Sequence, residues 1–206
     1  MTRLFIIRHA ERHKIKTQAD VPKVLLTKEG KAHARQLGVL MRMKLNSDRI
    51  SIVTSKYERC FQTGLSFSVG YGLNNVSMLQ KDPSDFLHRV FRHSLKDEKR
   101  LKYDHIFKHE IYGDTMRLWK SGQYKDILVN PEWLFNSMVQ LAGISMTNTM
   151  LIFAHDINVS VVGISNDMPE LYSKKPGFLH GAYTDDHRKG DWKPFIPAED
   201  MDLLAA

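Results

Sequence analysis

The sequence contains very little cysteine and no long hydrophobic run. Cys60 is the only cysteine among the 206 residues, so no disulfide can form within the chain. No apolar run approaches the roughly 18 residues that a membrane-spanning helix requires. The N-terminus also lacks the basic segment, apolar stretch and small-residue cleavage site of an export signal. We therefore expect a cytoplasmic protein that does not enter a membrane.

The composition is ordinary for a globular protein, but the charge is unbalanced. Hydrophobic residues make up 42% of the chain and charged residues 26%, which is enough apolar material for one core in a single domain spanning 1–206. Lys and Arg number 30 against 23 Asp and Glu, giving a formal net charge of +7. This balance fits an anionic partner such as a nucleic acid, an acidic lipid surface or a phosphorylated small molecule.

Apolar segments alternate with amphipathic segments along most of the chain. Four segments are typical of strands: 2–7, 51–56, 76–80 and 149–154. Four others are typical of helices: 27–44, a segment from 57 onward, 130–143 and a segment from 156 onward. This alternation predicts an α/β fold, a three-layer α/β/α arrangement with a mostly parallel central sheet. The basic and aromatic residues 81–125 are predicted to form a mainly helical insertion, and the chain after 168 an irregular tail.

Polar residues lie at or directly after the carboxyl ends of three of the expected strands. They are Arg8, His9, Thr54, Ser55, His155 and Asp156, with Arg59 about one helical turn after Ser55. Ligands of α/β sheets bind beyond the carboxyl ends of the strands. If these strands are parallel, all of the residues meet at one edge of the sheet.

The arginines of this cluster indicate what it binds. Arg8, Arg12 and Arg59 would repel one another unless an anion lay among them, and guanidinium groups match phosphate oxygens in shape and charge. A neutral imidazole in such a cage can attack phosphorus and carry the phosphoryl group as phosphohistidine. A carboxylic acid at the rim can protonate the leaving oxygen. This chemistry requires neither a metal nor a cofactor.

Four segments carry a resemblance to a known family: RHAER (8–12), LTKEGKAHARQLG (26–38), TSKYERCFQTG (54–64) and LIFAHD (151–156). Their order, and the apolar strands before three of them, resemble the histidine phosphatase (phosphoglycerate mutase-like) superfamily over residues 1–69 and 149–165. The resemblance implies that His9 is the nucleophile. It also implies a set of phosphate-binding residues: Arg8, Arg12, Arg59 and His155.

The resemblance offers two candidates for the general acid. The acid phosphatase branch of the superfamily has an aspartate directly after the second histidine and an arginine three residues after the nucleophile, as Asp156 and Arg12 stand here. The mutase-like branch instead uses a glutamate in the central region, and the counterpart here is Glu110 in HEIYGD (109–114). We favour Asp156 and the acid phosphatase branch, and we keep Glu110 as the alternative.

Two positions depart from the family pattern. Ala10 stands where the glycine of Arg-His-Gly is usual; its Cβ could crowd the phosphate loop, although compact phosphohistidine phosphatases of the same superfamily often resemble this chain in having Arg-His-Ala. Lys14 stands where the acid phosphatase branch commonly has a proline. That branch is typically larger, secreted and disulfide-bonded, so we expect a small intracellular relative.

Taken together, these features predict a metal-independent phosphomonoesterase that hydrolyses a small phosphorylated metabolite through phospho-His9. A phosphomutase, a protein phosphohistidine phosphatase and a non-catalytic phospho-ligand or RNA-binding module remain as alternatives. The basic and aromatic run 88–109 favours a solvated surface or a lid that steers an anionic substrate over RNA binding. His105 and His109 have the i, i+4 spacing of zinc ligands on a helix, but no third ligand accompanies them, and we expect no metal.

Overall fold

The computed structural model describes residues 2–45, 49–73, 79–81, 87, 112–143, 145, 147–188 and 190–197. In these residues one sheet has the strand order β3-β2-β4-β1-β5-β6. Its strands are β1 (Arg3–Arg8), β2 (Ile50–Thr54), β3 (Leu79–Lys81), β4 (Thr149–Ala154), β5 (Gly181–Thr184) and β6 (Trp192–Phe195). The first four strands are parallel, whereas β5 pairs antiparallel with β1 and with β6. The predicted mostly parallel sheet is confirmed.

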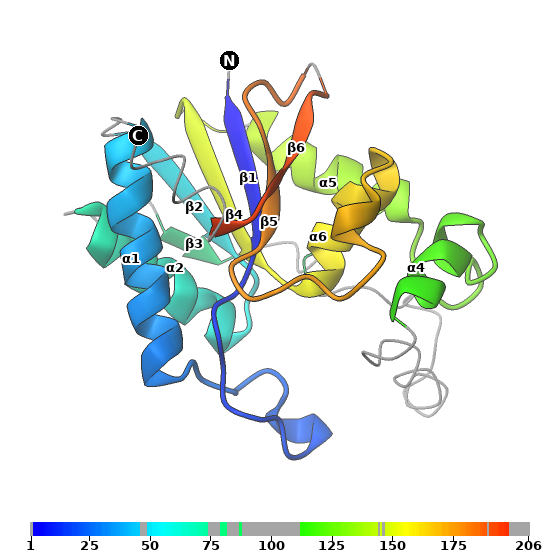
Figure 1. Ribbon diagram of the computed structural model, residues 1–206, viewed down its shortest axis with the longest axis horizontal. Coiled ribbons are helices and arrows are strands. Elements are labelled where there is room, and N and C mark those ends of the chain that lie inside the picture. Colours follow the sequence, from blue (N-terminus) through cyan, green and yellow to red (C-terminus); the bar gives the residue numbers. More distant parts are fainter. Residues whose placement is uncertain are drawn as a thin grey trace.

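Helices cover both faces of the sheet (Figure 1). On one face lie α1 (Lys28–Leu45) and α2 (Glu58–Tyr71), and on the other lie α5 (Pro131–Gly143) and α6 (Asp156–Ser165), with α4 (Tyr112–Lys120) beyond α6. Two short 3-10 helices, η1 (Gln18–Asp20) and η6 (Pro169–Leu171), lie in the connecting segments. The predicted three-layer α/β/α architecture is therefore confirmed.

Helix starts follow the capping residues in the sequence. The hydroxyl of Thr27 accepts a hydrogen bond from the backbone N–H of Gly30 at 2.9 Å, which begins α1. The side-chain oxygen of Asn130 accepts one from the N–H of Glu132 at 2.8 Å, with Pro131 in the first turn of α5. Each cap satisfies a donor that the first turn of a helix leaves free.

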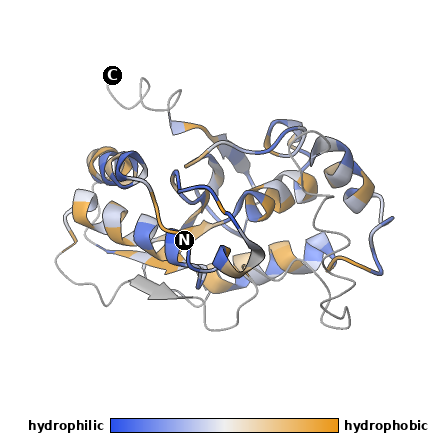
Figure 2. Ribbon diagram, turned by 90° about the horizontal axis from the view of Figure 1, so that it is seen from below, coloured by the Kyte–Doolittle hydropathy of each residue, from blue (hydrophilic) through white to orange (hydrophobic). Residues whose placement is uncertain are grey.

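The central strand β1 serves both halves of the core. Leu4 and Ile6 pack into the cluster formed with α5 and α6, whereas Phe5 and Ile7 pack into the cluster formed with α1 and α2. This division follows from the two-residue period of a strand. All four side chains are buried, so the apolar run is a strand buried on both faces. In Figure 2 the helices are banded in orange and blue, as helices with one buried side are expected to be.

The prediction of an irregular tail after residue 168 is wrong. This segment contains η6 and the hairpin of β5 and β6, which extends the sheet beyond β1. Pro194 lies in β6, the edge strand, where a missing backbone donor is tolerated. Between η6 and β5 the tail thus passes along the edge of the sheet where the carboxyl end of β1 lies.

The predicted insertion at 81–125 falls mainly outside the described residues, which here include 81, 87 and 112–125; the described part contains α4. Glu110, His105 and His109 also lie outside them. Among the described residues no helix is long and apolar enough to cross a membrane.

Candidate active site

The carboxyl ends of β1, β2 and β4 bring the polar residues of the three motifs together. Arg8 pairs with Ala154 in the register of β1 and β4, so the next residues, His9 and His155, emerge side by side. Their ring centroids are 5.7 Å apart. Ser55, which follows β2, donates its backbone N–H to Phe153 at 3.0 Å. The parallel register therefore explains why three distant segments converge here.

His9 is held in one orientation and one tautomer. Only 3% of the residue is exposed. Its Nδ1–H donates to the carbonyl oxygen of Ala10 at 2.8 Å, which leaves Nε2 as the acceptor of a hydrogen bond from Arg59 Nε at 3.1 Å. Burial, followed by the charges of His155, Arg59 and Arg8, lowers the pKa of His9 well below its ordinary value. At neutral pH the ring thus presents an unprotonated Nε2, the form required of a nucleophile.

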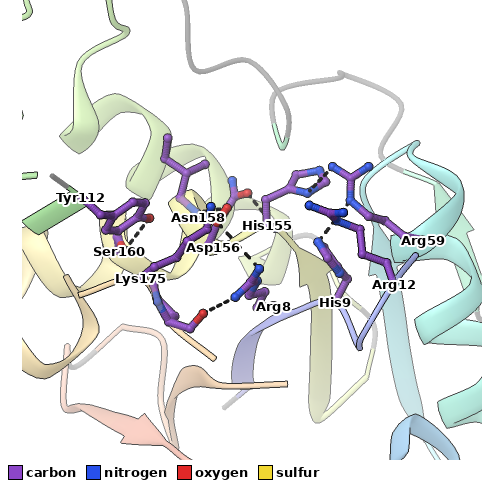
Figure 3. Close-up of polar contacts among 12 residues, drawn as sticks. Arg8, His9, Arg12, Arg59, Tyr112, His155, Asp156, Asn158, Ser160 and Lys175 are labelled. Atoms are coloured by element: carbon purple, nitrogen blue, oxygen red, sulfur yellow. Dashed lines mark hydrogen bonds and ion pairs between the residues drawn. The ribbon is translucent and has the colours of Figure 1, made fainter. Parts of the chain in front are cut away.

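Arg59 joins the two histidines (Figure 3). Besides its bond to His9, its Nη2 lies 3.3 Å from Nδ1 of His155, and its Nη1 donates to the carbonyl oxygen of Val21. Because Arg59 donates to Nδ1, the proton of His155 is on Nε2, which donates to the hydroxyl of Ser55 at 3.0 Å. The guanidinium also lies over the ring of Tyr57, 4.7 Å from its centroid. One cation therefore contacts both imidazoles.

Two further arginines carry buried N–H donors. Nε of Arg8 and Nε of Arg12 are buried, and neither has a hydrogen-bond acceptor among the described residues. Burial, followed by the charges of Arg59 and Arg8, lowers the pKa of Arg12. A buried cationic donor without an acceptor is costly. These two donors, and the mutual repulsion of Arg8, Arg12 and Arg59, favour an anion as the ligand of this site.

The two ends of Arg8 differ in their surroundings. Its Nη1 donates to the carbonyl oxygen of Pro176, and its guanidinium lies over the ring of Phe178, 4.3 Å from the centroid. Its Nη2 is 3.9 Å from Oδ2 of Asp156. In Figure 3 Arg8 accordingly lies between His9 on one side and the pair of Asp156 and Lys175 on the other.

Asp156 begins α6 at the rim of the cluster. Its Oδ1 accepts the backbone N–H of Ile157 at 3.0 Å, and its Oδ2 lies 2.8 Å from Nζ of Lys175. Burial opposes ionisation of this carboxyl, but the nearby Arg8 and Lys175 outweigh it and hold the pKa of Asp156 well below its ordinary value. The carboxyl is therefore ionised at neutral pH.

Thr63 and Gly30 hold the loop that carries His9. Thr63 accepts the backbone N–H of Ala10 at 3.0 Å and donates to the carbonyl oxygen of Arg59 at 2.7 Å, which ties the His9 loop to α2. On the other side α1 approaches so closely that a Cβ added at Gly30 would lie 2.1 Å from the carbonyl oxygen of Glu11. The loop is thereby fixed between two helices.

Ala10 is fully buried and belongs to the core cluster of β1, α1 and α2. Its methyl group therefore packs with core side chains, and the effect of alanine in place of glycine on the phosphate loop stays a prediction. Cys60 is also buried, and burial raises its pKa to about 12.

Sequence reasoning missed Lys175, Phe178 and Thr63. Lys175 and Phe178 lie in a segment with no helical or strand periodicity, which gave no signal. Thr63 lies in the quoted TSKYERCFQTG segment, and its position one turn after Arg59 on the same helix could have suggested a contact. The alternative acid, Glu110, lies outside the described residues. Within those residues no group of three or more His, Cys, Asp or Glu side chains could hold a metal ion.

The overall fold matches solved structures at low sequence identity. The protein histidine phosphatase SixA complexed with tungstate is 14% identical with a TM-score of 0.54, covering 96% of this chain and 99% of that one. The mycobacterial glucosyl-3-phosphoglycerate phosphatase is 14% identical with a TM-score of 0.58, covering 95% and 98%. The phosphoglycerate mutase from Bacillus anthracis is 12% identical with a TM-score of 0.55, covering 99% and 95%. No family model and no curated protein matches the sequence. The chain has the fold of the histidine phosphatase superfamily.

Proposed function

We propose that this chain, with its histidine phosphatase fold, is a metal-independent cytoplasmic phosphomonoesterase that hydrolyses a small phosphorylated metabolite through phospho-His9. The observation that carries the proposal is the environment of His9. Its unprotonated Nε2 lies 3.1 Å from Arg59, beside the buried N–H donors of Arg8 and Arg12 that have no acceptor among the described residues. A phosphoryl group supplies the oxygens that these donors require.

The first chemical step would transfer the phosphoryl group to the enzyme. The Nε2 lone pair of His9 attacks phosphorus, the bond from phosphorus to the ester oxygen breaks, and the leaving oxygen takes a proton from Asp156. Meanwhile the equatorial oxygens receive hydrogen bonds from a set of cationic or polar groups: Arg8, Arg12, Arg59 and His155. The buried Nε donors of Arg8 and Arg12 have no acceptor among the described residues, whereas Arg59 must first release Nε2 of His9, and His155 must release Ser55, before they donate to phosphate. Once turned to the phosphoryl oxygens, these groups stabilise the developing charge.

The second step would release phosphate. Asp156, now a carboxylate, takes a proton from a water molecule whose oxygen attacks the phosphorus of phospho-His9. The P–N bond breaks, its electron pair returns to Nε2, and inorganic phosphate leaves. The hydrogen bond from Nδ1–H to Ala10 holds the ring in the same orientation through both steps.

Asp156 must carry a proton for the first step, although it is ionised before substrate binds. A phosphate ester dianion among the arginines offsets the positive field that keeps the carboxyl ionised, and this raises the pKa of Asp156. A substrate with a poor leaving group, such as an alkyl phosphate, tests the assignment. Asp156→Asn should lower its turnover far more than Glu110→Gln. The opposite ranking would make Glu110 the acid and place the chain with the mutase-like branch rather than the acid phosphatase branch.

A protein phosphohistidine phosphatase is the second candidate, because a protein of that description, SixA, shares the fold over nearly its whole length. The two differ in substrate: one acts on a small phosphate ester and the other on a phosphorylated histidine of another protein. A phosphate-release screen over sugar, nucleotide and amino-acid phosphates, alongside a phosphohistidine-bearing protein, separates them. Release from the protein alone would favour the second candidate. A phosphomutase would instead move the phosphoryl group to a second hydroxyl without net release of phosphate.

The direct test of the proposed activity is hydrolysis of p-nitrophenyl phosphate in the presence of EDTA. We expect turnover in the wild type, no turnover in His9→Ala, and inhibition by orthovanadate, which mimics pentacoordinate phosphorus. Unchanged turnover in His9→Ala would sink the nucleophile assignment. Complete inactivity on the whole ester panel, together with tight binding of inorganic phosphate or RNA, would favour a non-catalytic binding module.

A further inference from the structure

The carboxyl group of Asp156 has a second cationic neighbour, Lys175, which is not one of the proposed phosphate-binding residues. Oδ2 lies 2.8 Å from Nζ of Lys175 and 3.9 Å from Nη2 of Arg8. Only 20% of the Asp156 side chain and 26% of the Lys175 side chain are exposed. The pair is therefore partly shielded from water, and its attraction exceeds that of a surface salt bridge.

Lys175 is held in place by contacts of its own segment, residues 175–178, which we call the strap. The carbonyl oxygen of Pro176 accepts a hydrogen bond from Arg8, and the ring of Phe178 lies against the Arg8 guanidinium. The ammonium group of Lys175 also lies 5.7 Å from the ring centroid of Tyr112. The strap thus fixes the backbone beside Lys175 directly at the site edge.

Lys175 differs from the arginines in where it lies. Asp156 experiences the charge or dipole of groups from several elements, which are Arg8, Arg12, Arg59, Cys60, Tyr112, His155 and Lys175. An anionic phosphoryl group bound among the three arginines offsets their charge. Lys175 comes from the strap, on the side of Asp156 away from the two histidines (Figure 3), so its charge is offset least. It is the cation that continues to act on Asp156 when substrate is bound.

We propose that Lys175 is a positioning residue that holds the Asp156 carboxyl ionised and so sets the upper pH limit of the acid step. This inference rests on the proposed phosphatase function. An opposite charge within about 4–6 Å lowers the pKa of a carboxyl group by about 1–3 units. Removal of the Lys175 charge therefore raises the pKa of Asp156. At a fixed pH above that pKa, the protonated fraction of Asp156 increases about tenfold for each unit by which its pKa is raised.

The first experiment compares the pH dependence of kcat for an alkyl phosphate in Lys175→Met, Lys175→Arg and Lys174→Met. Lys174 is the adjacent, exposed lysine, so its replacement changes the net charge equally. We expect the upper pH limb to move to higher pH by about one unit or more in Lys175→Met. It should stay in place in Lys174→Met and be restored in Lys175→Arg. The shift should be smaller on p-nitrophenyl phosphate, whose leaving group needs little protonation. An upper limb identical in Lys175→Met and Lys174→Met would overturn the proposal.

The second experiment does not depend on turnover. The carboxyl carbon of Asp156 is followed by NMR through a pH titration, in the wild type and in Lys175→Met, with and without inorganic phosphate. We expect a higher titration midpoint in the variant, and a midpoint raised further by phosphate in both proteins. Equal midpoints in wild type and variant would contradict the role of Lys175. A raised midpoint in a protein that releases phosphate from no ester would support Lys175 and reject the proposed function.

Discussion

Replacing His9 with glutamine should remove one identifiable part of the pH dependence of stability. His9 is 3% exposed, and burial together with His155, Arg59 and Arg8 keeps its pKa well below 6.5 in the native state. In the unfolded chain the same side chain becomes protonated as the pH falls through about 6.5. The unfolded state then binds more protons than the native state, so stability that is fully present above pH 6.5 is lost as the pH falls.

The magnitude follows from that single proton. At pH 5.5, one unit below the unfolded pKa, the loss is RT ln(1 + 10), or about 1.4 kcal/mol. In His9→Gln the side-chain amide can still accept a hydrogen bond from Arg59, but it does not titrate. The variant should therefore lose about 1.4 kcal/mol less than the wild type between pH 7.5 and pH 5.5.

Urea unfolding at these two pH values, followed by circular dichroism, measures the difference. The other nine of the ten histidines are common to both proteins, so their contributions cancel in the comparison. Equal losses of unfolding free energy in the wild type and in His9→Gln would refute the reasoning, because His9 would then take up its proton in the native state as readily as in the unfolded chain.

Three further substitutions and one control test the site and its support. Arg59→Met removes the cation that contacts both histidines and should lower kcat/KM for p-nitrophenyl phosphate by about 10²–10³. The urea midpoint should not fall, because the substitution also removes a buried charge that the neighbouring arginines repel. Activity within tenfold of wild type would count against this role. Ala10→Gly deletes a fully buried methyl group and should cost about 1 kcal/mol of unfolding free energy with no gain in kcat; a faster enzyme would show that the methyl group does crowd the phosphate loop. Gly30→Ala places a Cβ 2.1 Å from the carbonyl oxygen of Glu11 and should cost about 1–3 kcal/mol and reduce kcat, whereas Gly143→Ala, with open space around its Cβ, should change neither.

The sequence predicted the parallel part of the sheet and the convergence of its motifs because those features depend on local signals. An apolar run such as LFII, with polar residues directly after it, marks both the strand and its carboxyl end. Parallel strands bring such ends to one edge whatever the detailed packing. Arg8, His9, Arg59, His155 and Asp156 could therefore be placed together without knowledge of any contact between them.

The tail could not be predicted in the same way. β5 has four residues and β6 contains Pro194, so neither shows the alternation that marks a longer strand. The position of this hairpin depends on the pairing of β5 with β1, which lies more than 170 residues earlier in the chain. Lys175 and Phe178 reach the site only because this pairing returns the chain to the carboxyl end of β1. Local sequence patterns do not predict a pairing between segments so far apart in the chain.

The most direct test of the central claim is detection of the phosphoenzyme. The wild type is mixed with a ³²P-labelled substrate, quenched in alkali within milliseconds, digested, and the labelled peptide is sequenced by mass spectrometry. The account predicts an alkali-stable, acid-labile phosphoramidate on His9, formed and lost at rates compatible with turnover and absent from His9→Gln. Turnover with no labelled protein, or label on a residue other than His9, would contradict it.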